Sequence, residues 1–105
     1  MIATVEAEEM AEACAVAGLR KLGFTIIPLG ARSSAAALIE AWKVRQRVVV
    51  RVNTSVSPSK PQPLTIEAEQ ALRRRATRTG AQAWEAQVLL GSDLELVQLE
   101  WRPLE

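Results

Sequence analysis

The spacing of apolar residues predicts the first helix of this chain. Between residues 4 and 22, apolar side chains recur at intervals of three and four, which is the period of one helix face. The members of this stripe are Ala11, Cys14, Ala15, Gly18, Leu19 and Leu22. Because most of them are small, we expect the helix to lie close against a sheet, and Gly23 is placed to terminate it.

Shorter runs rich in β-branched residues predict the first three strands. Residues 24–29 and 35–42 form the first two, and residues 48–52 form a third that is mostly valine. Residues 43–47 make a basic turn between the second and third strands. Alternation puts Val48, Val50 and Val52 on one face of the sheet and Arg47, Val49, Arg51 and Asn53 on the other.

The second half of the chain predicts another helix and two more strands. Residues 55–63 hold three of the five prolines and are expected to form an exposed, mobile loop. Thr65 is then a helix N-cap and Gly80 a helix end. The apolar stripe of this helix is Ala68, Ala71, Leu72, Ala76 and Thr79. Residues 83–90 and 94–101 follow as strands, with a tight turn at residues 91–93.

The order of these elements, α-β-β-β-α-β-β, predicts an α/β fold in which a mixed sheet carries two helices (an α+β mixed sheet). A chain of 105 residues is one domain, here residues 1–105. It has no histidine and one cysteine, Cys14. This composition excludes histidine-based nucleophilic triads, ordinary zinc sites and intrachain disulfides.

The net charge and the apolar runs bear on whether nucleic acid or a membrane can be a partner. The net charge is +1, so only a local patch could attract nucleic acid. No apolar run reaches transmembrane length and the first residues are acidic, so we expect a cytoplasmic protein with no membrane partner. No pattern indicates a cofactor or a small-molecule substrate.

Several short signatures follow one another along the chain. Glu12 precedes Gly23-Phe24, and Arg32-Ser33-Ser34 follows the first predicted strand. Further along are Glu69-Gln70-Ala71-Leu72, Thr79-Gly80-Ala81-Gln82-Ala83-Trp84 and Trp101-Arg102. In this order and spacing, residues 12–104 resemble the PD-(D/E)XK (restriction-endonuclease-like) superfamily, and within it the archaeal Holliday junction resolvases. The resemblance implies a restriction-endonuclease-like α-β-β-β-α-β-β core and a homodimer.

The resemblance does not extend to the catalytic residues. In the family, an Asp on the second strand and a Glu-X-Lys on the third form a site for a divalent cation that activates water. The aligned positions here are Ala37 for the Asp, and Arg51 and Asn53 for the Glu and the Lys. Glu12 is the one acid that is kept, and one carboxylate does not hold Mg²⁺. The comparison therefore implies no metal site and no catalytic residue.

Three further interpretations concern charged residues. Glu40 lies three residues beyond Ala37 and could be a migrated acid, although alternation turns the two to opposite faces unless a bulge intervenes. Asp93 is better explained as a turn residue. We also expect Arg51 to reach Glu12 and to take the place of the cation as its ion-pair partner.

Three functions are consistent with this pattern. The first is a catalytically inactive nuclease-fold protein, a dimeric module that binds branched or duplex DNA. Its phosphate-binding residues would be Arg32, Arg45, Arg47, Arg51 and Lys60. The second is a protein-interaction or assembly subunit that does not bind nucleic acid. The third is a divalent-metal-dependent endonuclease that uses Mg²⁺ with Glu12 and Glu40.

The three tryptophans bear on the second function. Trp84 and Trp101 lie on the apolar C-terminal strands and could supply an interface between subunits. Packing in the core is the simpler explanation for Trp84. Trp42, at the end of the hairpin, is the tryptophan that we expect to be partly exposed.

Overall fold

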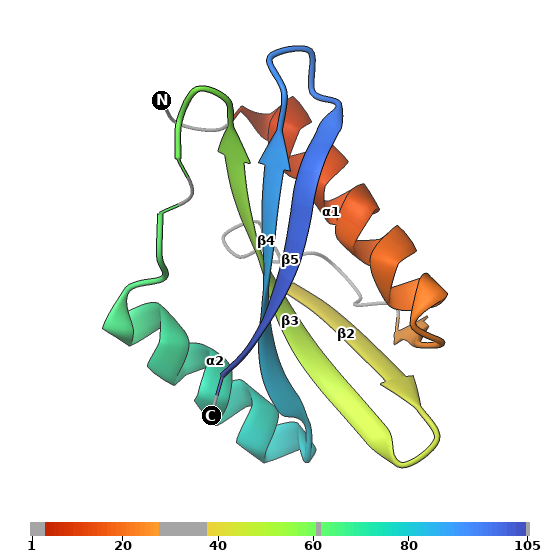
Figure 1. Ribbon diagram of the computed structural model, residues 1–105. Helices are drawn as coiled ribbons and strands as arrows, with labels where there is room; N and C mark the ends of the chain where they lie inside the picture. The colour runs from red at the N-terminus through yellow and green to blue at the C-terminus, as the bar shows by residue number, and fades with distance from the viewer. Residues whose placement is uncertain (1–3, 28–37, 61, 105) are drawn as a thin grey trace.

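A computed structural model describes residues 4–27, 38–60 and 62–104, which form a mixed sheet with a helix on each face (Figure 1). In chain order the elements are α1 (Val5–Lys21), β1 (Thr25–Ile27), β2 (Leu38–Lys43), β3 (Gln46–Val56), α2 (Ile66–Thr79), β4 (Gln82–Leu90) and β5 (Leu96–Leu104). The predicted order and the α/β fold class are confirmed. No helix in the described ranges is both long and apolar enough to span a membrane.

The strands lie side by side in the order β1-β2-β3-β4-β5. All neighbours are antiparallel except β3 and β4, which are parallel. Parallel neighbours need a crossover connection, and α2 provides it by returning the chain from the end of β3 to the start of β4 (Figure 1). The turn of the β2–β3 hairpin and the C-terminus of α2 therefore lie at the same end of the sheet.

The ends of α1 are set by local hydrogen bonds and by one glycine. The hydroxyl of Thr4 accepts a hydrogen bond from the backbone N–H of Ala7 at 3.1 Å, which satisfies a free donor of the first turn. After Lys21 the chain leaves the helix, and Gly23 (φ 94°) adopts the left-handed backbone that leads into β1. The prediction that Leu22 belongs to the buried stripe is wrong: it is 45% exposed, because it follows the last helical residue.

The face of α1 that contacts the sheet is made of small residues, as predicted. Its fully buried members, spaced four residues apart, are Ala7, Ala11, Ala15 and Leu19. They pack on one side of the sheet, which we call the α1 face and which carries Val48, Val50, Val52, Ala86, Val88 and Leu90. The closest approach is at Gly18, where a Cβ atom would lie 2.9 Å from Cζ2 of Trp101.

The other side of the sheet, the α2 face, has a smaller apolar core. Its cluster consists of Val49, Leu72, Ala76, Ala83 and Leu104. The caps of α2 are those predicted: the Thr65 hydroxyl accepts from the N–H of Ala68 at 3.1 Å, and Gly80 (φ 68°) ends the helix. Ala71 is exposed, contrary to prediction, because α2 contacts the sheet along the line of Leu72 and Ala76 and Ala71 lies to one side of it.

Several strand boundaries differ from the prediction. Lys43 pairs with Gln46, so the hairpin turn is only Val44 and Arg45. β3 continues to Val56, into the proline-rich region, because β4 pairs with it that far. β5 begins at Leu96 because the turn before it is longer, although Asp93 is a turn residue as predicted. Residues 28–37, which include Arg32 and Ala37, lie outside the described residues.

Replacing Gly18 with alanine tests the close packing of α1 on β5. The added methyl group would lie within 3.0 Å of side-chain atoms of Leu99 and Trp101. Such overpacking costs about 1–3 kcal/mol, more than the gain of roughly 1 kcal/mol in helix propensity. We expect Gly18→Ala to lower the free energy of unfolding measured in urea. The loss should shrink in a Trp101→Leu background, and an equal loss in both backgrounds would contradict the packing explanation.

Candidate nucleic-acid interface

The positions aligned with the nuclease motif are separated by the sheet. Glu12 is on α1, over the α1 face. Arg51 and Asn53 point to the α2 face, since they alternate with Val50 and Val52 of the α1 face. The expectation that Arg51 pairs with Glu12 is therefore wrong.

β3 presents no acidic side chain to the α1 face that could bind a metal ion together with Glu12 of α1. The side chains that β3 turns to this face are apolar: Val48 and Val50 are fully buried and Val52 nearly so. Within the described ranges, no group of three or more Asp, Glu, His or Cys side chains is arranged to hold a metal ion. A metal site on the α1 face would thus need acids that β3 does not supply.

Glu40 lies on the α2 face, and its carboxylate is already bound to an arginine. Its Oε2 accepts a hydrogen bond from Nη2 of Arg75 at 2.8 Å, and this ion pair joins β2 to α2. The sheet separates Glu40 from Glu12, because Ile39 and Ala41 on either side of Glu40 belong to the α1 face. The two residues therefore do not form a migrated metal site together.

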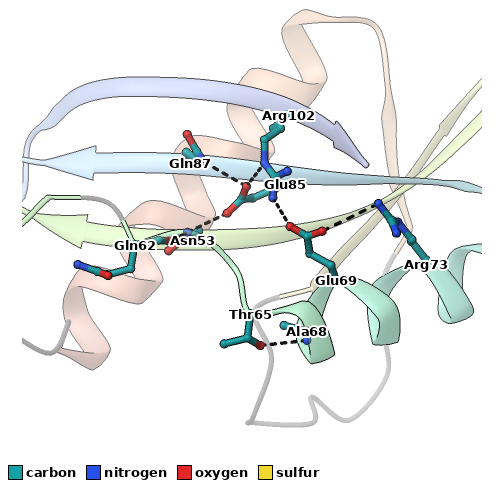
Figure 2. A network of polar contacts seen from close by, with 9 residues as sticks. All are labelled: Asn53, Gln62, Thr65, Ala68, Glu69, Arg73, Glu85, Gln87 and Arg102. Atoms are coloured by element: carbon teal, nitrogen blue, oxygen red, sulfur yellow. Dashed lines mark hydrogen bonds and ion pairs between the residues drawn. The ribbon is translucent and has the colours of Figure 1, made fainter. Parts of the chain in front are cut away.

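A buried carboxylate on the α2 face was not singled out from the sequence. Glu85 of β4 is fully buried, and its two oxygens accept three side-chain hydrogen bonds (Figure 2). Oε1 accepts from Nε of Arg102 at 2.6 Å and from Nε2 of Gln87 at 3.1 Å. Oε2 accepts from Nδ2 of Asn53 at 2.8 Å. Burying a carboxylate is tolerated only when its oxygens are satisfied in this way.

Arg102 connects this carboxylate to α2. Its Nη2 donates to Oε2 of Glu69 at 2.8 Å, and Oε1 of Glu69 also forms an i,i+4 ion pair with Nη2 of Arg73 at 3.9 Å (Figure 2). The hydrogen bonds to Glu69 and Glu85 raise the pKa of the Arg102 guanidinium above its usual value. An arginine thus occupies the space between two carboxylates, as a cation would, and fastens helix to sheet. We call Asn53, Glu69, Glu85, Gln87 and Arg102 the Glu85 cluster.

Sequence reasoning missed the Glu85 cluster because its members are far apart in the chain. Glu85 and Gln87 occupy the polar positions of an alternating strand, which is also the pattern of a face in contact with water. Their burial depends on the register that sets Glu85 opposite Arg102 and on α2 lying above them. The available signal was Ala83, an apolar residue on the same face, which indicates that this face is covered.

The basic residues predicted to bind phosphates do not form one group. Arg45 and Arg47 lie at the β2–β3 turn, and Arg51 is half-buried in the middle of the α2 face. Lys60 lies beyond the opposite end of β3, where it lines a cleft of about 250 Å³ with Thr54 and Ser55. The fifth, Arg32, lies outside the described residues.

Two of these residues belong to a larger cationic surface that the topology assembles. The β2–β3 turn is joined to the end of α1 by a hydrogen bond from Nζ of Lys43 to the Leu22 carbonyl at 3.2 Å. It is joined to the start of β4, just after α2, by a hydrogen bond from Gln46 to Gln82 at 3.0 Å. Both helices end here with basic residues (Figure 1). We call this part of the molecule the basic end; its residues are Arg20, Lys21, Lys43, Arg45, Arg47 and Arg78.

Acidic residues gather at the other end of the molecule. The N-terminus of α1 carries Glu6, Glu8 and Glu9, and the turn between β4 and β5 carries Asp93 and Glu95 (Figure 1). The Asp93 carboxylate raises the pKa of Glu95 above its ordinary value, because it accepts a hydrogen bond from the protonated form of Glu95 and because its negative charge disfavours the ionised form. The near-zero net charge therefore conceals a strong separation of charge along the molecule.

The tryptophans divide into two that are packed and one that is exposed. Trp84 packs against Phe24 and Trp101, with ring centroids 5.7 Å and 6.0 Å apart, and both tryptophans contact the core of the α1 face. Core packing therefore explains Trp84, and these two rings are not a free interface. Trp42 is 47% exposed, as predicted, and it lies at the basic end.

Comparison with known proteins gives no further indication, since no family model and no curated protein sequence matches this chain. A function can be inferred only from the geometry of the chain itself, and its most distinctive surface feature is the basic end.

Replacing Glu85 with alanine tests the cluster that holds α2 on the sheet. Removing one partner of a buried ion pair costs about 3–5 kcal/mol. Arg102 is 41% exposed and can turn toward water, so we expect a smaller loss, about 2–3 kcal/mol in the free energy of unfolding. The control Arg73→Ala, at an exposed ion pair, should change it by less than about 0.5 kcal/mol. Strictly additive effects of Glu85→Ala and Arg102→Ala would contradict the network.

Proposed function

We propose that this protein binds nucleic acid through the sugar–phosphate backbone, with the basic end as the contact surface, and that it does not cut the strand it binds. The observation that carries the proposal is that a cationic turn and two cationic helix ends lie at the same end of the molecule (Figure 1). A cluster of this kind binds phosphates without reading sequence.

The cations of the basic end have few competing partners. In the described part of the chain, the ion pairs of arginine involve Arg73, Arg75 and Arg102 and none of the residues of the basic end. Most of the basic-end cations are arginines, whose planar guanidinium groups suit bidentate contacts with phosphate. The acidic residues at the other end of the molecule would repel the phosphates of a nucleic acid. The separation of charge therefore favours approach of the nucleic acid to the basic end.

The backbone at the hairpin turn also supports a binding role. Arg45 has φ 65°, in the left-handed region that favours glycine, and its side chain is exposed. Placing a non-glycine residue there costs about 1–2 kcal/mol. Such strain is typical of positions where a side chain is kept for function rather than for stability.

The proposal that the protein does not cut nucleic acid rests on the positions of its acidic residues. The order of elements is compatible with the nuclease-like core that the sequence resembles. However, β3 turns valines toward Glu12, and Glu40 is paired with Arg75 on the other face. In the described ranges these acids cannot join in binding a metal, so we propose that the fold serves binding alone.

A salt series tests the proposal. Fluorescein-labelled 20-nucleotide single strands and 20-base-pair duplexes would be titrated by anisotropy between 50 and 200 mM salt, and the affinity should fall steeply, with a log–log slope of about −0.9 per duplex phosphate contact. Arg47→Ala should weaken binding to every sequence and reduce the slope by about 1. The control Lys60→Ala, away from the basic end, should change neither.

The contrary result would favour the second function. If neither probe binds at about 10 μM protein in 50 mM salt, where non-specific binders are normally detected, the protein is better explained as an assembly subunit. Its interface would then lie at the β5 edge, where Leu96 and Val97 are exposed. A homodimer through this edge is compatible with either function, because the edge does not include the basic end.

The substitution Arg45→Gly tests whether Arg45 contributes to DNA binding or to the stability of the hairpin turn. Glycine relieves the left-handed strain but adds entropy to the unfolded chain, and the two effects are of similar size. We expect the free energy of unfolding to stay within about 1 kcal/mol of its original value, while the affinity for DNA falls because one phosphate contact is lost. Lower stability together with unchanged affinity would show that Arg45 serves the fold instead.

A further inference from the structure

Trp42 is a large aromatic side chain that the fold leaves open at the basic end. It lies on the α2 face of β2, directly opposite Arg47 of β3 and Thr25 of β1. It belongs to neither apolar cluster of the described residues. α2 packs mainly on β3 and β4, and it contacts β2 through Leu38 and through the ion pair of Arg75 with Glu40, so Trp42 stays 47% exposed.

The surroundings of Trp42 combine an aromatic surface with positive charge. Arg47 is its cross-strand neighbour on the same face, at a separation that lets the two side chains act on one ligand. Trp42 is 47% exposed, and the cation–π contact found among the described residues joins Lys43 to Phe24, 4.6 Å from the ring centroid, rather than Arg47 to the indole. Val44, at the tip of the turn, is 83% exposed but has no aromatic ring on which a base could stack.

We infer that Trp42 stacks against an unpaired base, so that the nucleic acid held at the basic end contains a single-stranded segment. This inference rests on the proposed function. Single-strand-binding proteins combine a cationic surface that follows the backbone with aromatic side chains on which bases stack. The basic end supplies both parts: Arg45 and Arg47 for the phosphates, and Trp42 for the base.

A duplex cannot use this ring in the same way. Its bases are stacked on one another, and exposing one requires unpairing and unstacking it. Duplex DNA would therefore contact the arginines and leave Trp42 without a partner. The other two tryptophans cannot substitute, because they pack in the core of the α1 face.

The test compares two probes on variants of Trp42. A labelled 12-mer of deoxythymidine is the single strand, and a blunt-ended 12-base-pair DNA of two annealed strands is the duplex. Trp42→Ala should weaken binding of the single strand at least about fivefold, as the loss of one stacked base does, and change duplex binding less than twofold. Trp42→Phe should keep most of the affinity for the 12-mer, whereas Trp42→Leu, which is apolar but not aromatic, should not. Val44→Ala is the control on the same turn and should change single-strand binding less than twofold.

A second measurement does not depend on any variant. A 12-mer in which 5-iodouracil replaces thymine would be irradiated in complex with the unaltered protein and the crosslinked peptide identified by mass spectrometry. We expect the crosslink at Trp42.

The outcomes separate the inference from the proposed function. If both probes bind but Trp42→Ala and Trp42→Leu weaken them equally, or weaken neither, and the crosslink lies elsewhere, the stacking role is overturned while phosphate binding stands. If neither probe binds the unaltered protein, the proposed function fails and the inference fails with it. If Trp42→Ala does not fold, the comparison of Trp42→Phe with Trp42→Leu and the crosslink decide the question.

Discussion

β3 and β4 are parallel neighbours, paired from Val48 opposite Gln82 to Val56 opposite Leu90. This pairing decides where the cationic ends of the helices lie. Parallel neighbours cannot be joined by a tight turn, so α2 must cross the sheet and end where β3 begins. The β2–β3 turn lies at that end because it immediately precedes β3, and α1 ends there because β1 pairs with β2. Both helices carry acids in their first turn and bases in their last, as the helix dipole favours. The topology therefore turns two local preferences into one cationic surface.

The two faces of the sheet are stabilised by different interactions. On the α1 face, alanines and Gly18 allow close approach, and the core is apolar. On the α2 face a few apolar residues are supplemented by two polar connections, the Glu85 cluster and the pair of Arg75 with Glu40. Neither includes a residue of the basic end. The surface proposed for binding can therefore hold a strained arginine and an exposed tryptophan without weakening what holds the fold together.

The order of the elements is compatible with the nuclease-like core that the sequence resembles, but the acids in the described ranges are not grouped to hold a metal ion. A metal-dependent site needs carboxylates from a helix and from strands on the same face of the sheet. In the described part of this chain the acids are distributed otherwise: Glu12 lies on α1, whereas Glu40 and Glu85 lie on the other face of the sheet and are bound to arginines. An ion pair of an arginine with an acid was expected for Arg51 and Glu12. The structure instead pairs Arg75 with Glu40 and Arg102 with Glu85.

The sequence by itself determined the elements, because the signals for them are local. Thr4 and Thr65 are caps, Gly23 and Gly80 end the helices, and alternation assigns the residues of β3 to their faces. The tertiary structure alone decided which charges meet. That Glu85 lies beside Arg102 and that Arg78 shares a surface with Arg45 depends on strand register and on the path of α2, which join segments far apart in the chain. A charged residue in a strand looks the same in the sequence whether water or a helix covers it, and only packing distinguishes the two.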